Sequence, residues 1–119
     1  MKYACLIYGD GDPVDSLPHN ELENVIAQAL AYTEDLRHKG HFLGGEALEP
    51  VQTATTIRRR NGKLSMTDGP FAETKEHLAG FFLVEAGDLN DAIRIASTHP
   101  SACWDAIEIR PVRELRLSS

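Results

Sequence analysis

Five side chains in this sequence of 119 residues have types and positions that suit proton transfer or the binding of a small anion: Asp68, Glu73, Lys75, His99 and Arg110. An imidazole gives or takes a proton near neutral pH, and a carboxyl group does so when its surroundings raise its pKa. Lysine and arginine bind anions, and the planar guanidinium can hold a carboxylate through two parallel hydrogen bonds. If the fold brings these residues to one cleft, they predict acid–base chemistry on a small molecule without a cofactor.

His99 is the candidate proton carrier. It directly precedes Pro100, at the expected carboxyl end of a helix that Asp88 opens, where the helix dipole favours a protonated imidazole. The structural alternative is a histidine that only caps carbonyl groups. Asp68 is the second candidate catalytic residue, because it heads the tight turn over residues 68–71 and could border the cleft. Its structural alternative is a carboxylate that accepts backbone N–H groups of that turn.

The next segment supplies two candidate substrate-binding residues. Glu73, Lys75 and His77 share one face if the segment is extended, because side chains alternate along an extended chain. Lys75 also stands between Glu73 and Glu76, so an ion pair could orient it beside a cleft. A solvated charge cluster is the alternative, and exposed pairs of this kind add little stability.

Other motifs in the chain are incomplete. His38 and His41 have HxxH spacing, but they span an expected helix end and strand start without a third ligand nearby. Gly9-Asp10-Gly11 lacks a glycine at position 14, so the dinucleotide fingerprint fails. We therefore expect no metal and no cofactor. The two cysteines, Cys5 and Cys103, are too few for a disulfide framework and fit reduced thiols.

Composition limits the class of protein. Eighteen acidic and twelve basic residues give a net charge of −6, and 42% of residues are apolar. This describes one domain over residues 1–119, too short for a two-domain cofactor enzyme. An acidic chain is not expected to bind nucleic acid or an anionic membrane directly. No apolar stretch has the length of a membrane span or the form of a signal peptide, so we expect a cytoplasmic protein.

The hydrophobic pattern predicts a ferredoxin-like α+β fold. Strands are expected at residues 3–8, 41–48, 78–85 and 106–112, and a hairpin at 54–67 turns at Asn61-Gly62. The first helix begins near Asn20, which forms a capping-box pattern with Glu23, and stops at Gly40. Its expected core face is Leu22, Val25, Ile26, Ala29, Leu30, Thr33 and Leu36. The order is βαββαβ with an inserted hairpin, in which two helices cover one face of an antiparallel sheet.

The second face of that sheet needs a cover. The strands at 3–8 and 78–85 are apolar on both sides, and two helices can bury one side only. We therefore expect a homodimer packed sheet to sheet. In the last strand Glu108 and Arg110 alternate with apolar residues and point to the partner. They would form an ion pair between subunits or line a polar cavity for an anionic or hydroxylated small molecule, with Arg110 as its anchor.

The segment at 67–76 (TDGPFAETKE), together with His99-Pro100, the IEIRPV run at 107–112 and the YACLIY strand, resembles the DGPF-domain branch of the YCII-related family. The resemblance covers almost the whole chain and implies a dimeric α+β barrel. Members of the branch often occur near or fused to extracytoplasmic-function sigma factors, which makes a sigma factor a candidate partner. Smaller relatives are thought to be enzymes that use a histidine near the first helix and an aspartate before the proline after the second. Here His99 occupies the pre-proline position, and His19 lies near the first helix.

Two functions follow from these observations. The first is a cofactor-independent acid–base enzyme with a small-molecule site in the cleft of the dimeric barrel. The second is a non-enzymatic ligand-sensing or protein-interaction module connected with sigma-factor regulation. An enzyme should show an enclosed pocket at the charged residues and a perturbed histidine. An interaction module should show those residues in ion pairs and an exposed apolar patch elsewhere.

Overall fold

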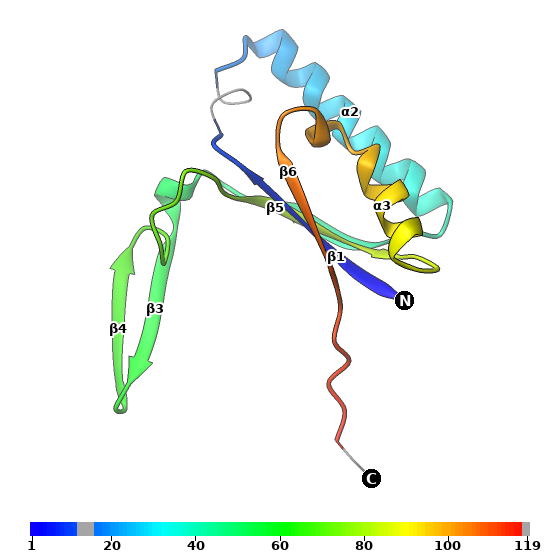
Figure 1. Ribbon diagram of the computed structural model, residues 1–119. Coiled ribbons are helices and arrows are strands. Elements are labelled where there is room, and N and C mark those ends of the chain that lie inside the picture. The colour runs from blue at the N-terminus through cyan, green and yellow to red at the C-terminus, as the bar shows by residue number, and fades with distance from the viewer. Residues whose placement is uncertain (12–15, 118–119) are drawn as a thin grey trace.

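The computed structural model describes residues 1–11 and 16–117, and it contains an antiparallel sheet of four strands in the order β2-β5-β1-β6 (Figure 1). These strands are β1 (Lys2–Gly9), β2 (Phe42–Ala47), β5 (His77–Glu85) and β6 (Ala106–Pro111). The helices α2 (His19–His38) and α3 (Leu89–Ser97) both lie on one face of the sheet (Figure 1). This is the ferredoxin-like α+β arrangement that the pattern predicts. The short 3-10 helices η1 (Val51–Thr53) and η2 (Pro100–Cys103) complete the body.

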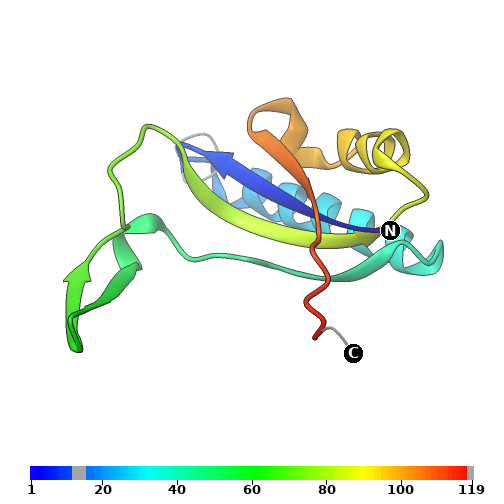
Figure 2. The same ribbon diagram turned by 60° about the horizontal axis from the view of Figure 1, so that its bottom comes forward.

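The inserted hairpin stands apart from this sheet. Strands β3 (Thr55–Arg60) and β4 (Lys63–Asp68) form a separate two-stranded sheet. Their turn has positive φ angles at Asn61 and Gly62, 51° and 77°, as a type I′ turn requires. We call residues 55–68 the arm, because they project from the body in both views (Figures 1 and 2).

The core lies between the sheet and the helices. Alternate residues of β1, namely Tyr3, Cys5 and Ile7, face the helices and are buried. Cys5 pairs with Phe82 of β5 and with Ile109 of β6, so these side chains share the same face. From the helices, Leu36, Ala92, Ile95 and Ala96 complete the buried cluster. Burial of these apolar surfaces is the main force that holds the helices on the sheet.

The two helices begin and end differently from the sequence expectation. The Asn20–Glu23 capping box does not form, because Pro18 occupies the N-cap position with extended angles and the helix starts at His19. The core face of α2 runs through Val25, Ala29, Tyr32 and Leu36, whereas Ile26 and Leu30 are exposed. Helix α3 begins as predicted, with the Asp88 carboxylate accepting the Asp91 N–H at 2.8 Å. It ends at Ser97 rather than at Pro100, because a residue before proline avoids the helical region and His99 is extended.

The other face of the sheet, which we call the open face, has no cover in the described part of this chain. Ala4, Leu6 and Tyr8 of β1 point to it, beside Phe81 and Leu83 of β5. The chain exposes 9070 Å², whereas a compact monomer of 13.1 kDa exposes about 6,400 Å². Its radius of gyration is 16.7 Å, against about 13.5 Å for a compact domain of this length. The arm and the C-terminal residues both project on the side away from the helices (Figure 2).

Two further expectations concern particular segments. In the part of the chain that the structure describes, no helix has the length and apolar character of a membrane span. The turn-rich loop that the sequence predicts after β1 falls partly on residues 12–15, which lie outside the described residues.

Candidate functional site

His99 lies at the start of η2, and its ring packs against the rings of Phe82 and Tyr32. Its imidazole stacks on Phe82 with ring centroids 5.1 Å apart and meets the edge of Tyr32 at 4.8 Å. Its Nδ1 accepts the backbone N–H of Ser101 at 3.0 Å, so the ring caps η2. An Nδ1 that accepts a hydrogen bond carries no proton, which places the proton of the neutral ring on Nε2. The remaining polar atom of His99 is therefore a hydrogen-bond donor.

Burial lowers the pKa of His99 below the ordinary value for histidine. This corrects the expectation that a helix dipole would favour the protonated ring. The residue lies beyond the end of α3, and its ring accepts from a backbone N–H, so the alternative of a histidine that caps helix carbonyls is also wrong. The dipole effect falls off within the last turn of a helix, whereas desolvation acts directly on the ring. His99 is consequently neutral at physiological pH.

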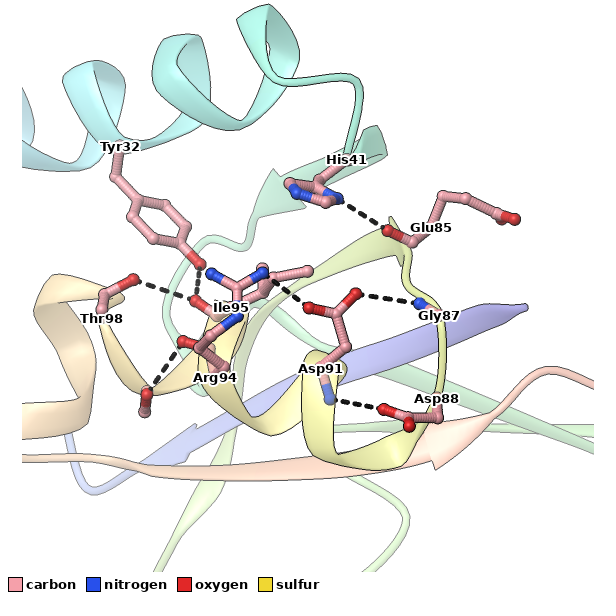
Figure 3. A network of polar contacts seen from close by, with 10 residues as sticks. Tyr32, His41, Glu85, Gly87, Asp88, Asp91, Arg94, Ile95 and Thr98 are labelled. Atoms are coloured by element: carbon pink, nitrogen blue, oxygen red, sulfur yellow. Dashed lines mark hydrogen bonds and ion pairs between the residues drawn. The ribbon is translucent and has the colours of Figure 1, made fainter.

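Tyr32 holds one side of the histidine in place. Its hydroxyl donates to the carbonyl oxygen of Ile95 at 2.6 Å, and the Thr98 hydroxyl donates to the same oxygen at 3.0 Å (Figure 3). Burial raises the pKa of Tyr32 to about 12, so the hydroxyl keeps its proton. The contacts join α2 to the last turn of α3, directly before His99. They fix the ring that packs against the imidazole.

The opposite end of α3 is fastened by a second set of contacts. The Asp91 carboxylate accepts the Gly87 N–H at 2.9 Å and pairs with Arg94 at 2.6 Å (Figure 3). These hydrogen bonds, first that of Gly87 and then that of Arg94, lower the pKa of Asp91. Hydrogen bonds therefore hold both ends of α3 in place. Because His99 follows the C-terminal end of this helix, they also fix the position of its backbone.

Asp105 lies just beyond the other end of η2. Burial raises the pKa of its carboxyl group, and the neighbouring charges of Asp10 and Glu76 raise it further. The carboxylate lies against the backbone of Gly9: a Cβ at position 9 would stand 2.1 Å from the Asp105 Oδ1, so the side chain would have to turn away. We call this region, with His99, Asp105, Asp10 and Glu76, the η2 end of the sheet.

A hollow of about 230 Å³ opens beside Asp105, between α3, η2 and β6. Apart from Asp105 and Ser97, its lining is apolar: Ile93, Ala96, Ala102, Ile107 and Ile109. Its volume is below the roughly 300–1,000 Å³ of common ligand pockets. His99 does not line it, because the imidazole lies over β5 whereas the hollow lies over β6. The two features are connected through η2.

The residues predicted around Asp68 occupy the arm and the loop that follows it. Asp68 ends β4 opposite Thr55, and within the described residues its carboxylate accepts no backbone N–H. The segment 69–76 forms bends rather than a strand, so Glu73, Lys75 and His77 do not share an extended face. Lys75 makes no ion pair within residues 1–11 and 16–117, which leaves its predicted pairing with Glu73 or Glu76 unformed. Of this loop, Glu76 approaches Asp105.

Arg110 lies on the open face, as the alternation along β6 predicts. Its Nε is 3.7 Å from a carboxylate oxygen of Glu108, and both side chains are largely exposed. Their neighbours in β1 are Ala4 and Leu6, which point to the same face. His99 is on the helix face, so the predicted residues do not converge within one chain.

Comparison with known proteins places this arrangement in a family. The model of the YCII-related domain matches residues 1–116. The chain belongs to the YCII-related domain family. An uncharacterized protein of Rhizobium meliloti is 33% identical over 116 residues, which cover 94% of this chain and 92% of that protein.

A solved structure shares the YCII-related fold of this chain. It is a 5-chloro-2-hydroxyhydroquinone dehydrochlorinase from Burkholderia phenoliruptrix, in complex with 2,5-dihydroxybenzoquinone. The TM-score is 0.55 and the sequence identity 15%, over 95% of this chain and 94% of the other. At this identity the likeness concerns the fold.

Sequence reasoning missed several residues of this YCII-related domain that shape the η2 end. Tyr32 could have been found, because Val25, Ala29, Tyr32 and Leu36 follow the spacing of one helical face. The sequence predicted Phe82 only as a member of an apolar strand, without a contact to His99. Asp105 and Gly9 lie 96 positions apart, and no pattern within either segment signals their contact.

Other candidates for chemistry are placed as follows. His19 is exposed and lies 3.1 Å from Glu23 on the first turn of α2, and His41 contacts the Glu85 carbonyl oxygen through Nδ1. Among the described residues no three His, Cys, Asp or Glu side chains are grouped as metal ligands. Both cysteines are free, and burial raises the pKa of Cys5 to about 11, so its thiol is not a nucleophile at neutral pH.

Proposed function

We propose that this YCII-related domain is a cytoplasmic homodimer that moves a proton on a small anionic or hydroxylated molecule at the η2 end, without a cofactor. One observation carries the proposal: His99 and Asp105 flank the same short helix, and the surroundings of each favour its uncharged form. Titratable pairs with shifted pKa values are characteristic of acid–base sites. The free cysteines fit a reducing compartment.

The two groups have different roles in this proposal. His99, with its proton on Nε2, donates a hydrogen bond to a substrate oxygen and stabilises the negative charge that develops there. Asp105, as a carboxyl group with a raised pKa, exchanges the proton with the reacting atom. The apolar hollow beside Asp105 receives the body of the molecule. Because His99 does not line this hollow, the substrate extends past η2 to bring its oxygen to the imidazole. No step requires a metal or a redox partner.

The known structure with the same fold supports the substrate class. That protein is a dehydrochlorinase and was solved with a dihydroxylated quinone. Removal of hydrogen chloride takes a proton and a chloride ion from the substrate, which is acid–base chemistry. The similarity extends over nearly the full length of both chains and supports a shared fold as the framework for this chemistry.

The second chain of the homodimer would cover the open face, which carries Arg110. Placed between two sheets, Arg110 would bind an anionic group of the ligand, and Asp68, Glu73 and Lys75 would border the site from a second chain. These four assignments remain predictions from the sequence.

The proposal is tested by identifying the ligand and then measuring turnover. Mass spectrometry of small molecules released from the natively purified protein supplies the compound. We expect kcat/KM for it to fall by about 10²–10⁴ in both His99→Gln and Asp105→Asn, the range of general acid–base groups. His38→Gln, an exposed histidine in the last turn of α2, serves as the matched control and should retain full activity. Unchanged turnover by His99→Gln would contradict the assignment.

The second candidate, a ligand-sensing or protein-interaction module, is favoured by a different observation. The arm exposes the apolar side chains of Ile57, Leu64 and Met66, which no catalytic role requires. Binding of the released compound by the wild-type protein with no conversion would favour this alternative. A sigma factor as the partner of such a module stays a prediction from the sequence resemblance.

A further inference from the structure

The arm has two faces of opposite character. Its register pairs Ile57 with Met66 and Arg59 with Leu64, so these side chains share one face. The other face carries Arg58, Arg60, Lys63, Ser65 and the two threonines Thr56 and Thr67. On the first face Ile57, Leu64 and Met66 are 62%, 55% and 71% exposed. We call this first face the apolar side of the arm.

An isolated two-stranded hairpin is marginally stable in water. The arm has no third strand, and neither of its strands belongs to the main sheet. In the described residues its base is held by the Gly69 N–H bond to the Ala54 carbonyl and by the Thr56 hydroxyl bond to the Gly69 carbonyl. These bonds fix where the arm leaves the body, and they leave its apolar side without a packing partner. Exposed apolar clusters of this kind mark interaction surfaces.

The direction of the arm indicates what it contacts. In both ribbon views the arm lies on the side of the sheet opposite to the helices, and so do the C-terminal residues after β6 (Figures 1 and 2). They project at separate places around the open face. A body that covers the open face therefore lies beside the arm. The surface in excess of a compact monomer, roughly 2,700 Å² per chain, is large compared with the roughly 800 Å² that each partner of a standard interface buries.

Charge favours a second copy of this chain as that body. The arm contains four basic residues and one acidic residue, a net charge of +3. Because the whole chain carries −6, the remainder carries −9. Two such remainders repel each other when their sheets approach, whereas each arm is attracted to the remainder of the other chain. A nucleic acid would instead meet the repulsion of the acidic body.

We propose that the arm is a dimerisation element: its apolar side packs on the body of a second copy, and its net positive charge offsets the repulsion between the two acidic bodies. The inference rests on the proposed homodimer and deepens it, since it names the element that holds the second copy. Each chain then contributes one arm and receives one, as two-fold symmetry requires. The arm also brings Asp68 and the following loop towards the partner.

The test compares the two sides of the arm by sedimentation equilibrium of the full-length chain. In the main variant Ile57, Leu64 and Met66 are all replaced by threonine, which keeps β propensity and removes apolar surface. In the matched control Ser65→Ala and Thr67→Ser alter the opposite side. We expect the dimer dissociation constant to rise at least tenfold in the main variant and to stay within twofold of wild type in the control. Far-UV circular dichroism checks that the body remains folded.

The outcomes separate the two proposals. A wild-type chain that sediments as a monomer overturns both the homodimer and the arm. A wild-type dimer whose main variant keeps the same dissociation constant overturns the arm and leaves the homodimer standing. A second measurement places a photo-crosslinker at position 64 in a mixture of ¹⁴N-labelled and ¹⁵N-labelled chains. Crosslinks between differently labelled peptides support the arm, and crosslinks confined to one chain overturn it.

Discussion

The two faces of the four-stranded sheet are formed by the same strands, yet they meet different surroundings. On the helix face, Tyr3, Cys5 and Ile7 are buried beneath α2 and α3. On the open face, Ala4, Leu6 and Tyr8 are equally apolar in type but remain partly exposed. Charged side chains reach the open face from the outer strand β6, through Glu108 and Arg110. The difference shows that one face of the sheet is packed within the chain, whereas the other face has no cover among the described residues.

The largest expected effect comes from neighbouring phenylalanines that face opposite ways. Phe82 is buried under the helices and supports His99, whereas Phe81 lies on the open face. We expect Phe82→Ala to reduce the free energy of unfolding by about 3–5 kcal/mol, because it leaves a cavity in the core. Urea denaturation at one fixed protein concentration measures this loss.

Phe81→Ala is the matched variant on the open face. It should weaken dimer formation and leave the unfolding of the dissociated chain nearly unchanged. If Phe81→Ala costs the dissociated chain as much as Phe82→Ala does, the two faces are packed alike within one subunit and the comparison fails.

A smaller effect is expected where β2 approaches β5 on the helix face. A Cβ added at Gly45 would lie 2.6 Å from the Phe81 carbonyl oxygen and 2.7 Å from the Phe82 Cβ. We expect Gly45→Ala to cost about 1–3 kcal/mol, because strand backbone must move to admit the methyl group. Glu46→Gln, an exposed change at the next position, should stay within about 0.5 kcal/mol. Equal denaturation midpoints for these two variants would show that the edge strand is looser than the structure indicates.

The smallest effect concerns pH and distinguishes His99 from the exposed histidines. Histidine in the unfolded chain has a pKa of about 6.5, and burial lowers the folded-state pKa of His99. Between these two values the unfolded chain binds a proton that the folded chain does not. Stability should therefore fall as the pH decreases from 6.5 towards the lowered folded-state pKa. Denaturation midpoints measured between pH 5 and 8 should fall towards low pH in the wild type and in His38→Gln. In His99→Gln the midpoint should fall less over the same range.

Asp105 should change the pH dependence of stability in the opposite direction to His99. Its folded-state pKa is raised, so the folded chain holds this proton more tightly than the unfolded chain, and ionisation destabilises the fold. Asp105→Asn should therefore raise the denaturation midpoint at pH 7 and raise it less as the pH falls through the folded-state pKa. A lower midpoint at pH 7 would mean that the carboxylate is stabilised by its surroundings, contrary to the proposed acid–base role.

Residues close in the sequence determined much of this protein. Alternation and helical spacing predict the strands, the helices and the ferredoxin-like order, and Asn61-Gly62 predicts the hairpin turn. The placement of Arg110 opposite the helices also follows from alternation along β6. Local pattern failed where two local preferences compete. Pro18 displaced the capping box, and Pro100 kept His99 outside the helix whose dipole was expected to act on it.

Only the tertiary structure decided what surrounds each functional group. The pKa of His99 is lowered because Phe82 and Tyr32, from a distant strand and helix, exclude water from its ring. The pKa of Asp105 is raised by burial and by the charges of Asp10 and Glu76, which are distant from it in the sequence. Electrostatic and desolvation energies depend on distances in space, and the sequence encodes those distances only through the whole packed fold.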